Sequence, residues 1–330
     1  MTRLWNIARL RNIAGGLAAA LVCAAAAAQT GDYPSRPIRL ITPFAAGGAI
    51  DVLCRVIGER LAQRLGQNVV VEAIPGANTI IGAQALLRAA PDGHTFMITT
   101  MSTTVNNRIL QSKLPYDPDR DLAPITQLSY GSVLMVAPAG APYKDAKGFI
   151  EWAKAQKRAI SYGSWGVASW GHLAGQILKQ EQGVDLNHIP YKGDVMAIID
   201  LRNGTLDVAF ASPTSAKPQI ASGAIKAIAM TGPQRSPSMP ELPTFSEQGV
   251  PNMDLAIWLG VYAPAGTPRA ILDRLRNELK AITAQPDVLD KMLAQGQTPI
   301  VNTPDEFAAN YRADYPKWDA LIKASGAKIE

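Results

Sequence analysis

Cysteine and histidine are scarce in this 330-residue sequence, which contains two cysteines, Cys23 and Cys54, and three histidines. No histidine lies at a spacing from a cysteine or another histidine that is typical of metal ligands, so we expect no metal site and no cofactor. Cys23 lies in an N-terminal segment that we predict to be removed, which leaves Cys54 alone. We therefore predict a protein that folds without an internal disulfide, as a core of this size permits.

Runs of five or more like charges are also missing. The 32 basic and 27 acidic side chains give a formal net charge of +5, and the balance falls to 29 against 27 without Arg3, Arg9 and Arg11. Such a balance does not indicate a basic surface that binds nucleic acid. With 47% hydrophobic and 18% charged residues, the chain is expected to form a folded globular protein, with two domains or one domain with large insertions.

The motifs of several enzyme classes are missing as well. The nearest approach to the GxSxG motif of serine hydrolases, at residues 166–171, has one residue too many, and the histidines after Ser169 are not placed like those of a catalytic triad. His172 is better explained as a hydrogen-bonding residue at a helix start than as a base. Gly47 and Gly48 are not followed by the Lys-Ser or Lys-Thr pair of a Walker loop. We therefore expect neither a serine triad nor nucleotide binding.

The first thirty residues have the pattern of a secretory signal peptide. Arginines form a positive start, residues 13–22 an apolar run, and Ala26 and Ala28 the small-residue cleavage pattern. A membrane anchor needs roughly 20 strongly apolar residues, whereas this run is short and rich in alanine. Lipid attachment at Cys23 is less favoured, because a bulky valine precedes the cysteine. We predict a signal peptide at 1–28 and a periplasmic location.

Strand and helix patterns alternate along the rest of the chain. Residues 38–42 form an apolar run typical of a strand, and apolar side chains recur every three or four residues over 50–65, the period of a half-buried helix. Further strands are predicted at 69–72 and 95–100, with a helix at 80–88 between them. This alternation predicts a parallel sheet covered by helices.

A second series of the same kind follows between residues 133 and 230. It predicts strands at 134–137, 160–164, 187–189, 206–211 and 224–230, and helices at 145–157, 172–181 and 195–202. The closing segment has a strand at 258–262 and helices at 269–284, 286–295 and 304–325, and we expect it to return to the first lobe. The predicted fold is α/β with two lobes joined by two crossings, a hinged clamp with a cleft between them. Lobe 1 would comprise 31–130 plus 255–330, and lobe 2 would comprise 131–254.

Two glycine-containing turns that lead from a strand into a helix could bind an anion. The turn at 44–48 would point the free N–H groups of the helix start past the end of the strand. Glycine also suits any tight turn, so a purely structural role is equally well supported. Asp51 favours that structural role, because an acid in the first helical turn stabilises the helix and repels a bound carboxylate. The segment 161–171, rich in glycine and serine, opens a helix in the other lobe, so the two turns could hold two ends of a dianion.

Three tryptophans lie near these features. Trp165 and Trp170 belong to the polar second turn, where packing beneath the loop is slightly favoured over contact with a ligand. Trp258 lies on an apolar strand and is predicted to pack in the core or between the lobes.

Ordered motifs along nearly the whole mature chain resemble one family. They are YPSRPIRLITPFAAGGAIDVL, PGANTIIGAQAL, PDGHTF, KLPYDPDRDLAPIT, HLAG at His172, PYKG at Pro190 and WLGVYAPAGTP at Trp258. Together they resemble the substrate-binding proteins of tripartite tricarboxylate transporters, the Bug-type receptors. The resemblance implies a two-lobed periplasmic binding protein of type II, not an enzyme and expected to be monomeric. It would bind a carboxylate through loop backbone groups and bridging waters and deliver it to a membrane permease.

The resemblance also implies which loops contact the ligand. The matching residues are Phe44, Ala45, Ala46, Gly47 and Gly48 in the first turn, Ser102 and Thr103 after the strand 95–100, and Ser164, Gly166 and Ser169 in the opposite lobe. This chain departs from the family at Ala168, which replaces a glycine, and at Ala211, where many relatives have an aspartate that accepts from an ammonium or hydroxyl group. Trp165 and Trp170 stand where smaller residues are common. These departures predict an aromatic carboxylate, such as terephthalate, rather than an amino acid or citrate.

Two other functions stay open at this point. The same clamp could present its ligand to a signalling partner instead of a permease. An exported esterase using Ser169 is the third alternative, and it is the least favoured because no triad partner is in place.

Overall fold

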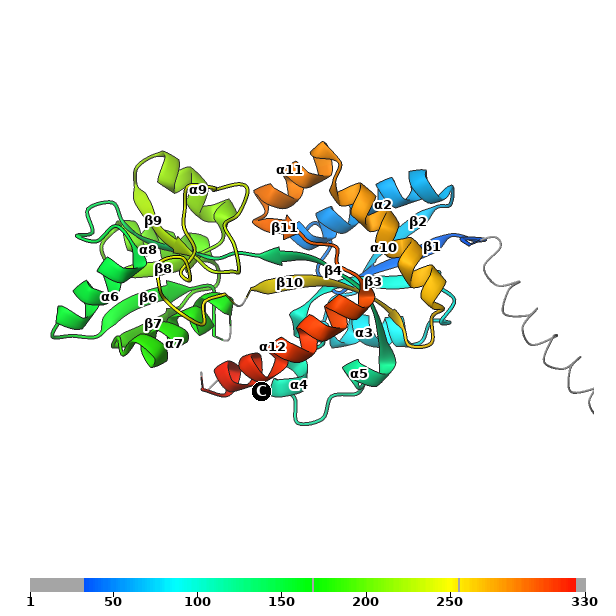
Figure 1. Cartoon of the computed structure of the whole chain (residues 1–330), viewed down its shortest axis with the longest axis horizontal. Helices are drawn as coiled ribbons and strands as arrows, with labels where there is room; N and C mark the ends of the chain where they lie inside the picture. Colours follow the sequence, from blue (N-terminus) through cyan, green and yellow to red (C-terminus); the bar gives the residue numbers. More distant parts are fainter. Residues whose placement is uncertain (1–32, 168, 255, 325–330) are drawn as a thin grey trace, which may run out of the picture.

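The computed structural model of the chain describes residues 33–167, 169–254 and 256–324. Its elements form two α/β bodies, which we call lobe 1 and lobe 2 (Figure 1). Lobe 1 contains a six-stranded sheet and lobe 2 a five-stranded sheet, each flanked by helices. The predicted two-lobed α/β fold is therefore confirmed. The predicted signal peptide, 1–28, and Ala168 lie outside the described residues.

Lobe 1 is built from the first and last parts of the chain, and its strands are ordered β11-β4-β10-β3-β1-β2. The strands are β1 (Ile38–Thr42), β2 (Val69–Ala73), β3 (Thr95–Thr100), β4 (Leu122–Gly131), β10 (Ile257–Pro264) and β11 (Gln297–Pro299). The helices are α2 (Ala49–Leu65), α3 (Ile80–Leu87), α4 (Asn106–Leu110), α5 (Pro118–Asp121), α10 (Arg269–Thr283), α11 (Pro286–Ala294) and α12 (Pro304–Ala324), with a 3-10 turn, η1, at Met101–Thr103.

Successive side chains of β1 point to opposite faces of this sheet and join different hydrophobic clusters. Leu40 lies in a cluster with Ile57 of α2 and Leu275 of α10, whereas Ile41 lies in another cluster with Leu86 of α3. Helices thus cover both faces, as expected for a strand with few polar side chains. The helix predicted at 50–65 is confirmed to within one residue.

Lobe 2 is formed by the middle of the chain, with strand order β7-β6-β8-β5-β9. The strands are β5 (Leu134–Pro138), β6 (Ile160–Ser164), β7 (Leu186–Pro190), β8 (Val208–Ala211) and β9 (Ile225–Met230). The helices are α6 (Ala146–Ala155), α7 (Trp170–Gln182), α8 (Asp194–Arg202) and α9 (Pro213–Ala221). The sequence pattern does not predict α9, because Pro218 lies inside it.

Both sheets are mixed, which corrects the prediction of parallel sheets. β10 runs antiparallel to β3 and β4, and β5 runs antiparallel to β8 and β9. The reason is the path of the chain between the lobes: β4 leads out of lobe 1 and β10 returns to it, so these crossing strands have opposite directions. The lobe boundaries at 130–131 and 254–255 stay a prediction.

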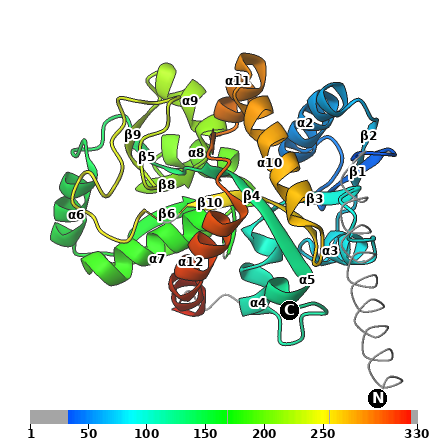
Figure 2. The same cartoon turned by 45° about the vertical axis from the view of Figure 1, so that its right-hand side comes forward.

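The last helix, α12, contacts both lobes. Its first turns pack on lobe 1, where the ring centroids of Phe307 and Trp258 are 5.2 Å apart. Its later turns lie along α7, where Trp318 packs on Trp170 with a centroid distance of 4.8 Å (Figure 2). The closing segment returns to lobe 1, as predicted, because β10 and β11 join its sheet. The additional contact of α12 with lobe 2 was not predicted, because apolar periodicity does not identify the partner of a helix. The predicted core position of Trp258 is confirmed.

Candidate functional site

A cavity of about 440 Å³ lies between the two lobes. Lobe 1 contributes Asn78, Thr100, Met101, Ser102, Asn106, Leu110 and Ile257 to its lining. Lobe 2 contributes Trp165, Val167, Ser169, Trp170 and Leu173, and α12 adds Trp318. A volume of this size suits a small organic molecule, since ligand pockets are typically of about 300–1,000 Å³.

The described residues that line this cavity carry no charged side chain. Hydroxyl and amide groups come from both lobes, with Asn78 and Ser102 on one side and Ser169 on the other. Three indole rings and several aliphatic side chains supply the rest of the wall. An anion held here would therefore meet neutral hydrogen-bond donors and apolar surface instead of an arginine or lysine.

The structure brings together only part of the predicted ligand set. Ser102, Trp165, Ser169 and Trp170 line the cavity. The remaining predicted positions are not among its lining residues: Phe44, Ala45, Ala46, Gly47, Gly48, Thr103, Ser164, Gly166 and Ala211.

The first glycine turn uses its own backbone donors. The N–H of Gly47 donates to Asp51 Oδ2 at 2.8 Å, and the N–H of Gly48 donates to the carbonyl oxygen of Ala45 at 3.2 Å. Gly47 has a φ of +80°, which favours glycine. The carboxylate of Asp51 thus lies where an external anion would bind, and this favours the structural role of the turn.

Asp51 is fully buried and pairs with Arg55 at 2.9 Å. Burial opposes its ionisation, but hydrogen bonds from Arg55 and from the N–H of Gly47 outweigh this and lower the pKa of Asp51 below its usual value. The predicted structural function of Asp51 in the first turn of α2 is confirmed.

Thr103 is buried in a hydroxyl and amide network behind the cavity wall. Its Oγ1 lies 2.7 Å from Thr99 Oγ1 and donates to Thr79 Oγ1 at 2.8 Å. Asn107 Nδ2 donates to the backbone oxygen of Asn78 at 2.7 Å, and the Asn78 amide donates back to Asn107 Oδ1 at 2.7 Å. The network therefore fixes the loop that presents Asn78 to the cavity.

This loop has an unusual backbone. Ala77, Asn78 and Thr79 are three successive non-glycine residues with φ of 44°, 48° and 77°. Such conformations cost of order 1–3 kcal/mol each and occur most often at functional sites. Asn106 Oδ1, also on the cavity wall, is buried without a hydrogen-bond partner in the described part of the chain. Sequence reasoning missed Asn78 and Asn106, although the PGANT segment contains asparagine, which tolerates left-handed backbone.

The second turn positions Ser169 in two ways. As the N-cap of α7 it accepts the N–H of His172 at 3.2 Å, and it lines the cavity. Its Oγ also lies 3.1 Å from Ser164 Oγ, which is fully buried and 2.7 Å from His188 Nε2. The prediction that His172 is a hydrogen-bonding residue at a helix start is confirmed.

His188 and His172 stack with ring centroids 4.1 Å apart. Burial, together with the neighbouring His172, lowers the pKa of His188 to about 4, and burial also lowers the pKa of His172. Sequence reasoning missed the pair of Ser164 and His188, which are 24 positions apart. Among the described residues no carboxylate hydrogen-bonds to His188, and the Ser164 hydroxyl is enclosed, so the pair lacks the geometry of a serine hydrolase.

Trp170 combines packing with cavity lining. It is 3% exposed, donates from Nε1 to Thr231 Oγ1 at 2.8 Å, and packs edge-on against Trp318. Trp165 is half-buried on the same wall. Ala211, by contrast, lies in the core cluster of lobe 2 with Leu134, so its side chain gives no surface to the cavity.

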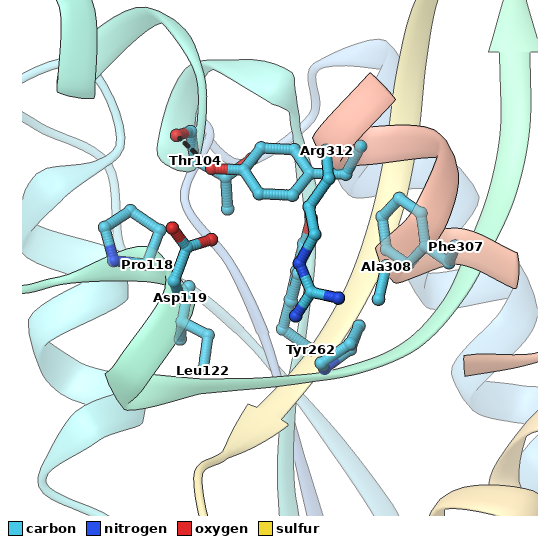
Figure 3. Close-up of a pocket in the computed structure, with 10 residues that line it drawn as sticks. Thr104, Pro118, Asp119, Leu122, Tyr262, Phe307, Ala308 and Arg312 are labelled. Atoms are coloured by element: carbon cyan, nitrogen blue, oxygen red, sulfur yellow. Dashed lines mark hydrogen bonds between the residues drawn. The ribbon is translucent and has the colours of Figure 1, made fainter. Parts of the chain in front are cut away.

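A much smaller cavity of about 40 Å³ lies inside lobe 1 (Figure 3). Thr104, Asp119, Tyr262 and Arg312 surround it, and Tyr311 OH donates to the backbone oxygen of Thr104 at 3.3 Å. This volume suits an ordered water rather than an organic ligand. The cavity between the lobes is large enough for an organic ligand and is lined from both lobes, so it is the candidate binding site.

Metal binding and membrane insertion find no support in residues 33–167, 169–254 and 256–324. Within these ranges no three His, Cys, Asp or Glu side chains are grouped so that they could hold a metal ion. Within the same ranges, no helix combines the length and apolar character of a membrane span.

Known proteins show the same sequence pattern and fold. The family described as "Tripartite tricarboxylate transporter family receptor" matches residues 53–327. Protein BugT of Bordetella pertussis is 30% identical over 98% of this chain and 100% of its own. The solved structure of a TctC solute binding protein from Polaromonas is 28% identical, covers 88% of this chain and 99% of its own, and superimposes with a TM-score of 0.79. A protein of R. palustris solved with adipate is 30% identical, with a TM-score of 0.71 over 90% of this chain and 100% of its own.

Proposed function

Because the chain belongs to the tripartite tricarboxylate transporter family of receptors, we propose that it is a periplasmic solute-binding protein that captures a small carboxylate between its two lobes. It would deliver this ligand to a membrane permease without catalysing a reaction, and it would act as a monomer after removal of 1–28. The observation that carries the proposal is the cavity of about 440 Å³ lined from both lobes by neutral donors. Closure of a hinged clamp around such a cavity would bury the ligand.

The neutral lining fits a carboxylate better than a cationic ligand. Asn78 and Ser102 from lobe 1 and Ser169 from lobe 2 can donate to carboxylate oxygens, and hydrogen bonds to an ionised acceptor are roughly twice as strong as neutral ones. No lining side chain in the described residues could neutralise an ammonium group. The R. palustris relative solved with adipate supports the same ligand class.

We further propose an aromatic carboxylate, such as terephthalate, as the preferred ligand. Trp165, Trp170 and Trp318 line the wall next to the donors, and half-buried Trp165 exposes the most ring surface, since Trp170 and Trp318 are 3% and 1% exposed. An aromatic pair contributes about 0.5–1.5 kcal/mol beyond the burial of area. The replacement of an aspartate by Ala211, which contributed to the sequence-based prediction, does not support this preference, because Ala211 is buried in the core of lobe 2.

Thermal-shift and calorimetric titrations test both levels of the proposal. Terephthalate, phthalate, adipate, succinate, citrate and several amino acids would be compared, and a ligand at a hundred times its Kd should stabilise the protein by about 2.7 kcal/mol. We expect terephthalate to bind more tightly than the aliphatic acids. Tighter binding of adipate or citrate would overturn the aromatic preference, and no response to any carboxylate would overturn the carboxylate function.

Export and the absence of catalysis have their own tests. The intact mass of the protein from the periplasm should correspond to cleavage near Ala28, and retention of 1–28 would contradict export by a cleaved signal peptide. Hydrolysis of p-nitrophenyl esters that disappears in Ser169→Ala would instead favour the esterase alternative.

A further inference from the structure

A second cavity, of about 350 Å³, lies further along the contact between α7 and α12. Leu173 of α7 lines the cavity between the lobes, and Ile177, one turn later, lines the second. On α12, Trp318 lines the first cavity and Leu321 lines the second. The two cavities are thus successive along the same pair of helices.

Trp318 stands between them. Its side chain is 1% exposed and packs edge-on against Trp170, with ring centroids 4.8 Å apart and an interplanar angle of 63°. The hydrogen bond from Trp170 Nε1 to Thr231 Oγ1 fixes the partner ring in turn. Trp318 is therefore held in place from the lobe 2 side.

The lining of the first cavity is of two chemical kinds. Asn78, Ser102 and Ser169 supply hydrogen-bonding groups, whereas Leu173 and Trp318 form apolar wall where α7 meets α12. A carboxylate held by the polar groups would direct its apolar body toward α7 and α12. In the second cavity, Ile177, Ala320, Leu321 and Ala324 supply apolar surface, whereas Gln180, Glu181, Asn252, Asp254 and Lys317 supply polar and charged groups.

We propose that Trp318 is a specificity-determining residue, which closes the apolar end of the ligand cavity and thereby limits the length of the ligand. The inference rests on the proposed carboxylate-binding function. In the absence of the indole ring, the two cavities would join, and a longer apolar chain could enter between α7 and α12.

A series of unbranched alkanoates, from acetate to decanoate, measures this limit by calorimetry. In the unmodified protein, Kd should fall about fourfold per added methylene, as expected for about 0.8 kcal/mol per buried CH₂, and then stop falling when the chain reaches Trp318. We call the chain length at which Kd stops falling the break. Trp318→Leu should move this break to alkanoates at least two methylenes longer. Trp318→Phe, which keeps a ring at the position, should leave the break close to that of the parent.

Ala320 offers a matched reversal. It is exposed on α12 and lines the second cavity, so Ala320→Phe should fill that space at little cost to the fold. In the Trp318→Leu background it should return the break to the parental chain length. Because Leu retains apolar volume, Trp318→Leu is less damaging to the core than Trp318→Ala, which creates a large cavity.

The outcomes separate this inference from the proposed function. An unchanged break in Trp318→Leu, with alkanoate binding intact, would overturn the function of Trp318 as a limit and leave the carboxylate function standing. If the unmodified protein binds none of the alkanoates and none of the acids named above, both are overturned.

Discussion

The two turns that lead from a strand into a helix differ in what occupies the helix start. Both follow a strand at the carboxyl edge of a sheet and both contain glycine, one at Phe44–Gly48 before α2 and one at Ser164–Ser169 before α7. In the first, Asp51 of the same chain takes the N–H of Gly47, and the turn does not line the cavity between the lobes. In the second, Ser169 caps the helix with its hydroxyl and still lines that cavity.

An acidic residue in the first helical turn accounts for the difference. α2 carries Asp51 there, whereas α7 has no acidic residue in its first turn. A carboxylate within the chain supplies the negative charge that the helix start favours, and it competes with any anion from outside. A glycine turn before a helix therefore indicates an anion site only when the helix does not bring its own acid.

The largest effect is expected at Trp170, which anchors the second turn. Trp170→Ala removes the packing on Trp318 and the hydrogen bond to Thr231, and should cost about 3–5 kcal/mol of the free energy of unfolding. Phe44→Ala is the matched change in the first turn and should cost less, because Phe44 is only half-buried. Urea unfolding measures both. Equal losses would show that the two turns are anchored alike.

Ser169 allows the cap and the ligand contact to be separated. Ser169→Gly keeps an acceptable N-cap, so the free energy of unfolding should change by only a few tenths of a kcal/mol. It removes a hydroxyl from the cavity, and a lost hydrogen bond to a carboxylate should weaken binding by about 1.5–3 kcal/mol, tenfold or more. Calorimetry with terephthalate and adipate measures the second effect. Affinity equal to that of the parent would exclude contact between Ser169 and the ligand.

Removal of the Asp51 carboxylate should destabilise the first turn in the ligand-free protein. Asp51→Ala leaves the N–H of Gly47 and the guanidinium of Arg55 without their acceptor, at a cost of about 1–3 kcal/mol. Adipate should then stabilise the variant more than the parent if the vacated helix start accepts an anion. Arg55→Ala is the control, because it removes the exposed partner and keeps the bond from Gly47. Identical stability of Asp51→Ala and the parent would contradict the capping function.

Acid should destabilise the two turns in different pH ranges. An unfolded histidine takes up a proton near pH 6.5, but folded His188 does so only near pH 4, so stability falls as the pH decreases between these values. Asp51 has a lowered pKa, and its contribution is present above its ordinary pKa of 3.8 and is lost only as the pH falls below that value. His188→Gln should reduce the loss between pH 6.5 and 4 and leave the loss below pH 3.8. Urea unfolding from pH 7.5 to 3 would show this, and an unchanged profile would refute it.

Local patterns predicted the elements well because each one depends on nearby residues. The strand expected at 38–42 is β1, and the helix expected at 50–65 is α2 extended by one residue. β4, at Leu122–Gly131, was missed because it runs between the lobes and mixes buried threonine, glutamine and serine with apolar residues. Its polar side chains find partners distant in sequence, such as Asn302, whose Oδ1 accepts the N–H of Gln127.

The candidate site was less predictable, since its residues meet only in the folded chain. Trp170 and Trp318 come from the two ends of the second half of the sequence, and no local pattern joins them. Asn78 reaches the cavity because its backbone is left-handed, a feature held by Asn107. The position of Gly47 in the turn is predictable from the sequence. The hydrogen bond from its N–H to Asp51 is not predictable, because it depends on side-chain geometry.

The smallest effect is expected at Gly48, and it tests the first turn most directly. Gly48 has φ −70°, which suits proline, but its N–H donates to the carbonyl oxygen of Ala45, so the proline ring would displace that oxygen. Gly48→Pro should therefore lower stability by at least the ~0.5–1.5 kcal/mol of the lost hydrogen bond and change the Kd for terephthalate or adipate by less than threefold. Gly47→Ala is the contrasting variant. The φ of +80° at Gly47 disfavours any other residue, so this substitution should lower the free energy of unfolding further. A tenfold loss of affinity in Gly48→Pro, with stability preserved, would mean that the turn gives its donors to the ligand and that the two turns bind anions alike.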